Sequence, residues 1–357
     1  MPPHLVTPLA QRVRWTATRA ALRPLIRWKP IDAPRLGYSM IIGVTRPLAP
    51  LLNLQLQLID AQNRSGLEDI ILVFDTSLSK VRSTLEPLVE RFAHLPLRLV
   101  GYNPIQAAVL HGIGWSKCFS WASWCLGLAR VQSRHAMLHD FDAFLLDPEF
   151  LAHRHRLIRE RDTQFLGVER YSHPPVLASD GLVGTWEMMF DAAWVRRNAR
   201  PIDVFNQRSL LYDRTVDLDT FHALQARAVT DLVPVESGAI VHATQMICQS
   251  QQLLRSPDHT APANMTTPLI PFLLEASGVS GSLEAADIVD QHATILGRRV
   301  RLLNLSADRV NGLRSMATAI DRTLRGGLRP EAEAYFDRLH QLASSLEPHR
   351  ESVALAA

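Results

Sequence analysis

Short apolar runs alternate with stretches of helical periodicity along the first 150 residues. Four apolar runs that end in polar or turn-forming residues predict buried strands. These runs lie in residues 38–44, 69–74, 97–101 and 135–141. Three intervening segments place apolar residues three or four positions apart, which predicts helices, and they are 51–62, 83–92 and 115–130. Strands that alternate with helices predict a mostly parallel sheet with helices on both faces, so the expected fold class is α/β.

The pattern becomes less regular after residue 150. Segments 164–169 and 238–241 predict short strands, whereas 184–197 and 217–229 predict helices. Residues 256–270 are rich in Pro, Ser and Thr, which is typical of a linker or surface loop.

Three parts are expected from this organisation. A basic N-terminal arm covers 1–31, and the α/β domain covers 32–255. A linker and a C-terminal helical appendage cover 256–357, where 331–345 has clear helical periodicity.

Composition narrows the class of protein. With 47% hydrophobic and 20% charged residues, the 357-residue chain can bury a sizeable core. A net charge of +3 gives no indication of a nucleic-acid partner. The three cysteines fit neither a disulfide framework nor a zinc site, and the apolar stretch 118–129 is too short to span a membrane. These features favour a cytoplasmic protein.

The N-terminal arm has an unusual charge distribution. No acid occurs before Asp32, and six basic residues precede it: Arg12, Arg14, Arg19, Arg23, Arg27 and Lys29. Apolar residues lie between them, so a helix here could bind peripherally to the anionic inner face of a membrane. A solvated, partly ordered arm explains the same pattern.

Two aspartates two residues apart follow the fourth predicted strand. Alternate residues of an extended strand share a face, so Asp140 and Asp142 can address one ligand. The carboxyl ends of strands in an open α/β sheet are where ligands bind. Two such carboxylates would share a hard divalent cation, Mg²⁺ or Mn²⁺, which also binds diphosphate oxygens. The alternative is that both aspartates only form a turn.

In this region the chain resembles the GT-A-fold glycosyltransferases, particularly the large inverting family that includes cellulose and chitin synthases. The resemblance covers about 36–245. Residues 38–46 resemble that family's first strand and loop, 70–77 its second strand, and 139–151 its metal motif. It implies a GT-A (Rossmann-like) domain that transfers a hexose from a nucleotide-sugar donor to a glycan or lipid-linked acceptor, with Mn²⁺ or Mg²⁺ as cofactor.

The resemblance also implies a donor-binding set. Asp75 matches the acid that holds the base or ribose, and Thr45 and Arg46 lie in the loop expected beside the donor. Lys117 and Arg134 are candidates for neutralising the diphosphate, although exposed surface charge explains them as well. The first loop lacks the family's Pro-x-Tyr-Asn sequence, and the Gln-x-x-Arg-Trp acceptor motif of processive polymerases is absent. These departures favour transfer of a single sugar.

Candidate catalytic acids lie downstream of the metal motif. Inverting transfer needs a general base for the acceptor hydroxyl, and Asp219, then Asp217, stand where the family has an acidic pair. Both also suit a helix N-terminus. Glu187, beside Trp186, is a further acid, with a helix-surface position as its alternative. His242 resembles the late histidine that many GT-A enzymes use as a third metal ligand, although a lone histidine is more often structural.

Two other classes remain open. A haloacid-dehalogenase-type phosphatase also has Asp-x-Asp at a strand end, but its motif continues with Gly and then Thr or Val, whereas Ala143 and Phe144 follow here. A non-catalytic nucleotide- or sugar-binding protein would keep the fold without the base.

Overall fold

The computed structural model describes residues 9–171, 181–211, 214–255, 266–289, 291–302 and 305–346. The chain forms two compact units. The first comprises Met1–Arg46, Asn63–Asp140 and Glu149–Glu236, and the second comprises Pro47–Gln62, Phe141–Pro148 and Ser237–Ala357. Most of the predicted linker lies outside the described residues. Among the helices that are described, none has the length and apolar character needed to cross a membrane.

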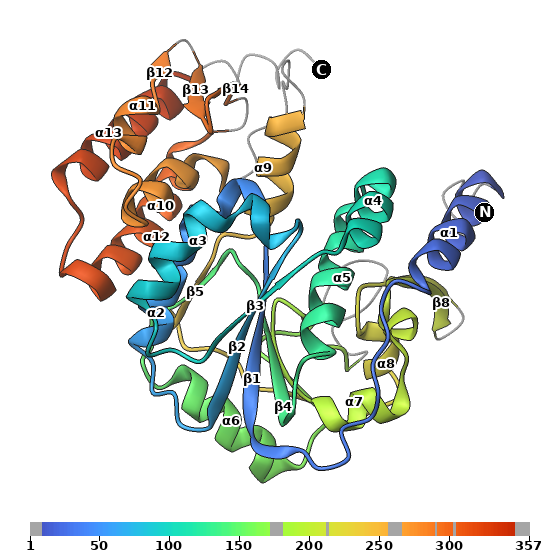
Figure 1. Cartoon of the computed structure of the whole chain (residues 1–357). Helices are drawn as coiled ribbons and strands as arrows, with labels where there is room; N and C mark the ends of the chain where they lie inside the picture. Colours follow the sequence, from blue (N-terminus) through green and yellow to red (C-terminus); the bar gives the residue numbers. More distant parts are fainter. Residues whose placement is uncertain are drawn as a thin grey trace. The chain divides into compact units, whose positions relative to one another are not determined.

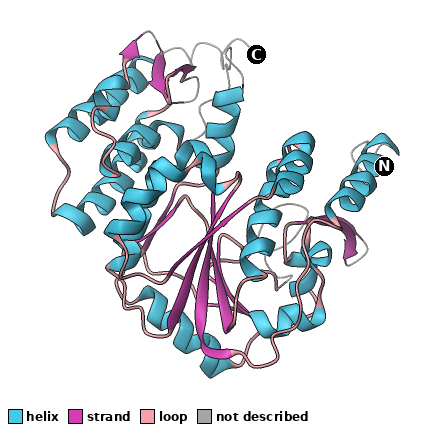
Figure 2. Cartoon of the chain, in the orientation of Figure 1, coloured by secondary structure: helices cyan, strands magenta, loops and turns pink. Residues whose placement is uncertain are grey.

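A seven-stranded sheet forms the centre of the first unit (Figures 1 and 2). Its strands, in the order β10-β6-β7-β4-β1-β2-β3, are β10 (Thr230–Leu232), β6 (Phe165–Gly167), β7 (Glu187–Asp191), β4 (Ser133–His139), β1 (Arg35–Val44), β2 (Leu67–Phe74) and β3 (Leu97–Gly101). All neighbouring pairs are parallel except those of β7, which runs antiparallel to β4 and β6. The sheet is therefore mostly parallel, and the predicted α/β class is confirmed.

Helices flank this sheet. They are α1 (Leu9–Leu22), α3 (Arg82–Arg91), α4 (Pro104–Ile113), α5 (Ser116–Leu128), α6 (Phe150–Arg161), α7 (Ala192–Asn198) and α8 (His222–Gln225). Helix α5 packs against β1 and β2, and α7 packs against β4. A Cβ atom at Gly127 would clash with the side chain of Ile41, so glycine allows α5 to lie close to β1. Cys118 and Cys125 on α5 are both buried.

The second unit has its own elements. They are α2 (Leu52–Asp60), β5 (Ala143–Leu145), β11 (Ile240–His242), α9 (Met246–Arg255), α10 (Ile270–Ala276), α11 (Ser282–Ala285), β12 (Ile288–Val289), β13 (His292–Ile295), β14 (Arg298–Arg301), α12 (Ala307–Arg325) and α13 (Pro330–Leu346). The predicted C-terminal helices are confirmed. The antiparallel sheet β12-β13-β14 was not predicted, because strands of two to four residues carry too little periodicity to recognise.

Two helices predicted after residue 180 are only partly confirmed. Residues 184–197 contain β7 followed by α7, because Met188, Met189 and Phe190 are all buried within the sheet. Asp191 is the N-cap of α7, and its side chain accepts from Trp194 N. Residues 217–229 contain the end of the hairpin formed by β8 (Gln207–Leu211) and β9 (Arg214–Leu218), followed by the single turn of α8.

The described part of the basic arm is exposed along much of its length, but one side of it packs against the first unit. Leu22 is fully buried, and Trp15 and Trp28 pack against the core of the first unit. The Trp15 ring stacks on Phe205, with 5.5 Å between ring centroids, and the guanidinium of Arg19 donates to backbone carbonyls. Trp15, Leu22 and Trp28 therefore pack against the protein itself, whereas Val13 is 59% exposed.

Candidate metal centre and neighbouring groups

The carboxyl ends of two parallel strands carry the first polar groups of the candidate site. Asp75 directly follows β2, and Asp140 directly follows β4. Both strands pair in parallel with β1, so the two aspartates leave the sheet at the same edge. Ligands of open α/β sheets bind at this edge.

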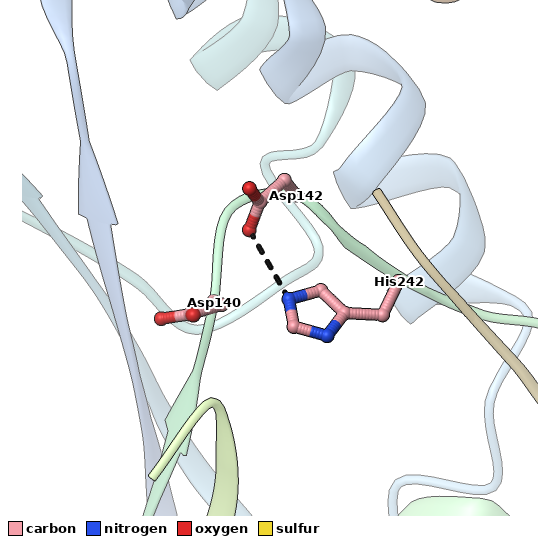
Figure 3. Close-up of side chains that lie close together, drawn as sticks. All are labelled: Asp140, Asp142 and His242. Carbon is pink, nitrogen blue, oxygen red and sulfur yellow. Dashed lines mark ion pairs between the residues drawn. The ribbon is translucent and has the colours of Figure 1, made fainter. Parts of the chain in front are cut away.

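Asp140, Asp142 and His242 form a compact cluster of metal-ligating groups (Figure 3). One ligand atom of each lies within 4.8 Å of the others, and Asp142 Oδ1 is 3.6 Å from His242 Nε2. Asp142 is only 3% exposed, whereas Asp140 and His242 keep partial contact with solvent. Close carboxylates repel unless a cation lies between them. Their oxygens suit Mg²⁺ or Mn²⁺, and imidazole is a common metal ligand, so the donor set fits a divalent ion.

Strand pairing explains how two of these residues meet. Strands β5 and β11 are antiparallel, and their register places Ala143 opposite His242. Ala243 N donates to the Asp142 carbonyl oxygen at 2.8 Å, which extends the pairing by one bond. Asp142 and His242 are therefore held side by side by backbone contacts, although 100 residues separate them in the sequence.

The strand that carries Asp140 is supported by a buried hydrogen bond between two side chains. His139 Nδ1 lies 2.5 Å from Glu187 Oε2, and both side chains are fully buried. Asp140 N donates to the Trp186 carbonyl oxygen at 2.8 Å. Glu187 thus lies in a central strand and not on a helix surface. A buried carboxylate bonded to His139 has no access to an acceptor hydroxyl, so we do not assign it a catalytic role.

Asp75 organises the loop that follows β1. Its carboxylate accepts from Thr45 Oγ1 at 2.8 Å and from Arg46 N at 3.0 Å. Burial raises the pKa of Asp75, and these two hydrogen bonds oppose the rise. His111 Nε2 lies 3.1 Å from the Asp75 carbonyl oxygen. The predicted donor residues Asp75, Thr45 and Arg46 therefore form one hydrogen-bonded group.

The two cations proposed for the diphosphate have other contacts. The Lys117 ammonium lies 4.9 Å from the ring centroid of Trp15, on the arm helix. Arg134 pairs with Asp162 and Asp191 near the start of β4. Six residues separate it from Asp140, which is roughly 20 Å along a strand. Arg134 is therefore excluded from a site at the carboxyl edge.

The candidate acidic pair is only partly described. Asp219 is half-buried, and its Oδ1 accepts from Asn206 Nδ2 and, at 2.7 Å, from Thr220 N. Asp217 lies in β9, where its backbone pairs with Arg208, and its side chain lies outside the described residues.

Sequence reasoning missed Gln55. Its Nε2 donates to the carbonyl oxygens of Phe141, at 2.9 Å, and Ala143, at 2.5 Å, on either side of Asp142. A signal was present in the sequence, because Gln55 lies three residues from both Leu52 and Leu58, on the apolar face of a predicted helix. A polar side chain on such a face needs a buried hydrogen-bond partner.

The fold and the cluster define an α/β protein with a candidate divalent-metal site at the end of a central strand. No protein-family model and no curated protein matches the chain. Among solved structures, residues 1–349 of S. aureus TarS are 11% identical, with 89% of this chain and 92% of that chain covered and a TM-score of 0.40.

Two further similar structures are sugar transferases by name. The mannosyltransferase PcManGT from Pyrobaculum calidifontis, in complex with GDP-Man and Mn²⁺, is 15% identical, covers 94% of this chain and 93% of its own, and has a TM-score of 0.41. The galactosyltransferase LgtC, in complex with donor and acceptor sugar analogues, is 11% identical and covers 45% of this chain and 60% of its own, with a TM-score of 0.33. At this level of likeness we draw no functional conclusion from the three structures.

Proposed function

We propose that this chain is a metal-dependent glycosyltransferase that moves a hexose from a nucleotide-sugar donor to a hydroxyl of a glycan or lipid-linked acceptor. The observation that carries the proposal is the cluster of Asp140, Asp142 and His242 at the end of β4. The resemblance of residues 139–151 to the GT-A metal motif supports the same assignment.

The donor would bind along the carboxyl edge of the sheet. Asp140, Asp142 and His242 would hold a divalent ion, which supplies positive charge to the diphosphate when bound. Asp75 follows β2, which is separated from β4 by β1 in the same sheet, and its carboxylate can accept from a ribose hydroxyl or a base N–H. Its bonds to Thr45 and Arg46 N fix the loop that would border the donor.

Inverting transfer would use Asp219 as general base. An acceptor hydroxyl is a poor nucleophile until a positioned carboxylate takes its proton. Asp219 is only half-buried, and its bonds to Asn206 and Thr220 fix its orientation. We expect Asp219→Asn to lower turnover about 10²-fold or more while donor binding, measured by calorimetry, stays nearly unchanged. Full turnover in this variant would remove Asp219 from the mechanism.

The function is tested by incubating the chain with a panel of nucleotide sugars and Mn²⁺. We expect slow release of nucleoside diphosphate from one of them, and no release by Asp142→Asn. Release of inorganic phosphate alone would instead indicate a phosphatase. Mn²⁺-dependent nucleotide binding without turnover, even with added glycan acceptors, would indicate a binding protein.

A further inference from the structure

Gln55 on α2 contacts the turn that carries Asp142. The Gln55 side chain is fully buried, and its amide NH₂ group has two hydrogens to donate. Its nitrogen lies 2.9 Å from the Phe141 carbonyl oxygen and 2.5 Å from the Ala143 carbonyl oxygen. One side chain therefore satisfies the backbone acceptors immediately before and after Asp142.

The intervening carbonyl is also bonded. Asp142 O accepts from Ala243 N at 2.8 Å, next to His242. Three successive carbonyl oxygens, 141 to 143, thus have defined donors within the second unit. These three hydrogen bonds fix the backbone around Asp142. The Asp142 carboxylate can therefore turn away from His242 only by rotation of its own side chain.

We propose that Gln55 is a positioning residue that orients Asp142 for the divalent ion. The inference rests on the proposed metal-dependent function. Groups that fix the orientation of metal ligands typically change metal affinity 10- to 100-fold when they are removed. Gln55 acts through the backbone on either side of Asp142.

The test compares Mn²⁺ affinity, measured by calorimetry, in Gln55→Met and in the wild-type chain. Methionine keeps the length of the side chain and removes both donors, so we expect the Mn²⁺ Kd to rise roughly tenfold. Gln57→Met is the matched control, because Gln57 lies on the same helix and donates only along it, to Asn53 O at 3.1 Å. Its Mn²⁺ Kd should stay within about twofold of the wild-type value.

A purely structural role is separated by measuring the melting temperature in EDTA. If Gln55→Met lowers that temperature but leaves the Mn²⁺ Kd unchanged, Gln55 only supports the fold and the proposal is overturned. Should Gln55→Met not fold, Gln55→Asn replaces it, because its shorter amide cannot reach both carbonyls and should raise the Kd as well. A wild-type chain that binds no Mn²⁺ would contradict the metal site itself, whereas equal affinity in wild type and variants contradicts only the role of Gln55.

Discussion

Tyr38, His135 and His155 form a buried polar cluster in the first unit. The ring centroids of Tyr38 and His155 are 4.8 Å apart, and those of His135 and His155 are 5.6 Å apart. Burial lowers the pKa of His135 to about 4 and also lowers that of His155. Both histidines are therefore neutral in the folded chain at pH values where the unfolded chain protonates them.

This cluster predicts loss of stability in acid. Folding lowers the pKa of His135 from 6.5 to about 4. Above pH 6.5 the histidine is neutral in both states and does not affect the free energy of unfolding. As the pH falls from 6.5 toward 4, only the unfolded chain takes up the proton, so the free energy of unfolding decreases. For His135 alone, the free energy of unfolding should drop by about 2 kcal/mol between pH 7.5 and pH 5. Urea unfolding at the two pH values measures this drop, and His135→Gln, which does not titrate, should reduce it by that amount. An equal drop in both chains would contradict the argument.

A second prediction concerns the group formed by Asp75, Thr45 and Arg46. Asp75→Ala removes the two bonds that hold the loop and the carboxylate that we propose as the acceptor for a nucleoside. We expect it to weaken nucleoside diphosphate binding by roughly 1.5–3 kcal/mol, the scale of hydrogen bonds to a charged group. Thr45→Val removes one loop bond and keeps the carboxylate, so its effect in the same calorimetric titration should be smaller. Equal affinity in Asp75→Ala and wild type would show that Asp75 does not contact the nucleotide.

Residue identities predicted part of the candidate site. The spacing of Asp140 and Asp142 indicated a shared ligand, and the structure brings His242 within reach of both. The burial of Glu187 could not be predicted, because it depends on pairing between residues 139 and 187 in different strands. The bonds of Gln55 depend in the same way on a turn 86 residues away.

At the scale of elements, helix α1 is held by Arg19. Its guanidinium donates to the carbonyl oxygens of Ile202, Phe205 and Asn206, at 3.0, 3.5 and 3.3 Å. Burial lowers the pKa of Arg19, and Asp203 opposes this. The positive charge in the sequence suggested a partner outside the chain, but at this position it serves an internal contact.

We therefore expect Arg19→Met to release α1 from the first unit. The loss of hydrogen bonds from a charged donor should cost about 1.5–3 kcal/mol and speed hydrogen exchange in residues 9–22. Arg14→Met is the control, because Arg14 is exposed and lies over the Trp115 ring, 4.3 Å from its centroid. If both variants exchange at the wild-type rate, the carbonyl contacts of Arg19 do not hold the helix.

Strand β7 shows why one element was mistaken for a helix. The sequence Glu187-Met-Met-Phe-Asp191 has no alternation of apolar and polar residues, because residues 187–190 are buried within the sheet. A short apolar run is ambiguous between a buried strand and a helix, and residues 192–198 continue as a true helix. Residues 187–191 form a strand because they pair with β4 and β6. Those partners lie elsewhere in the chain, so the local sequence does not reveal the pairing.

At the scale of the whole molecule, the alternation of strands and helices predicted the class of fold but not the strand order. The predicted strands 38–44, 69–74 and 97–101 correspond to β1, β2 and β3, which are neighbours in the sheet. The antiparallel strand β7 between β4 and β6 could not be foreseen, since nothing local to a strand specifies its neighbours. Each compact unit likewise combines segments that are distant in the sequence.

The central claim is that Asp140, Asp142 and His242 bind a divalent ion. Calorimetric titration of Mn²⁺ into the wild-type chain, Asp142→Asn and Asp147→Asn tests it most directly, because Asp147 is an exposed aspartate five residues from Asp142. We predict saturable binding of one Mn²⁺ by the wild type and by Asp147→Asn, and its loss in Asp142→Asn with an unchanged melting temperature in EDTA. Equal Mn²⁺ affinity in Asp142→Asn and the wild type, or no binding by the wild type, would contradict the account.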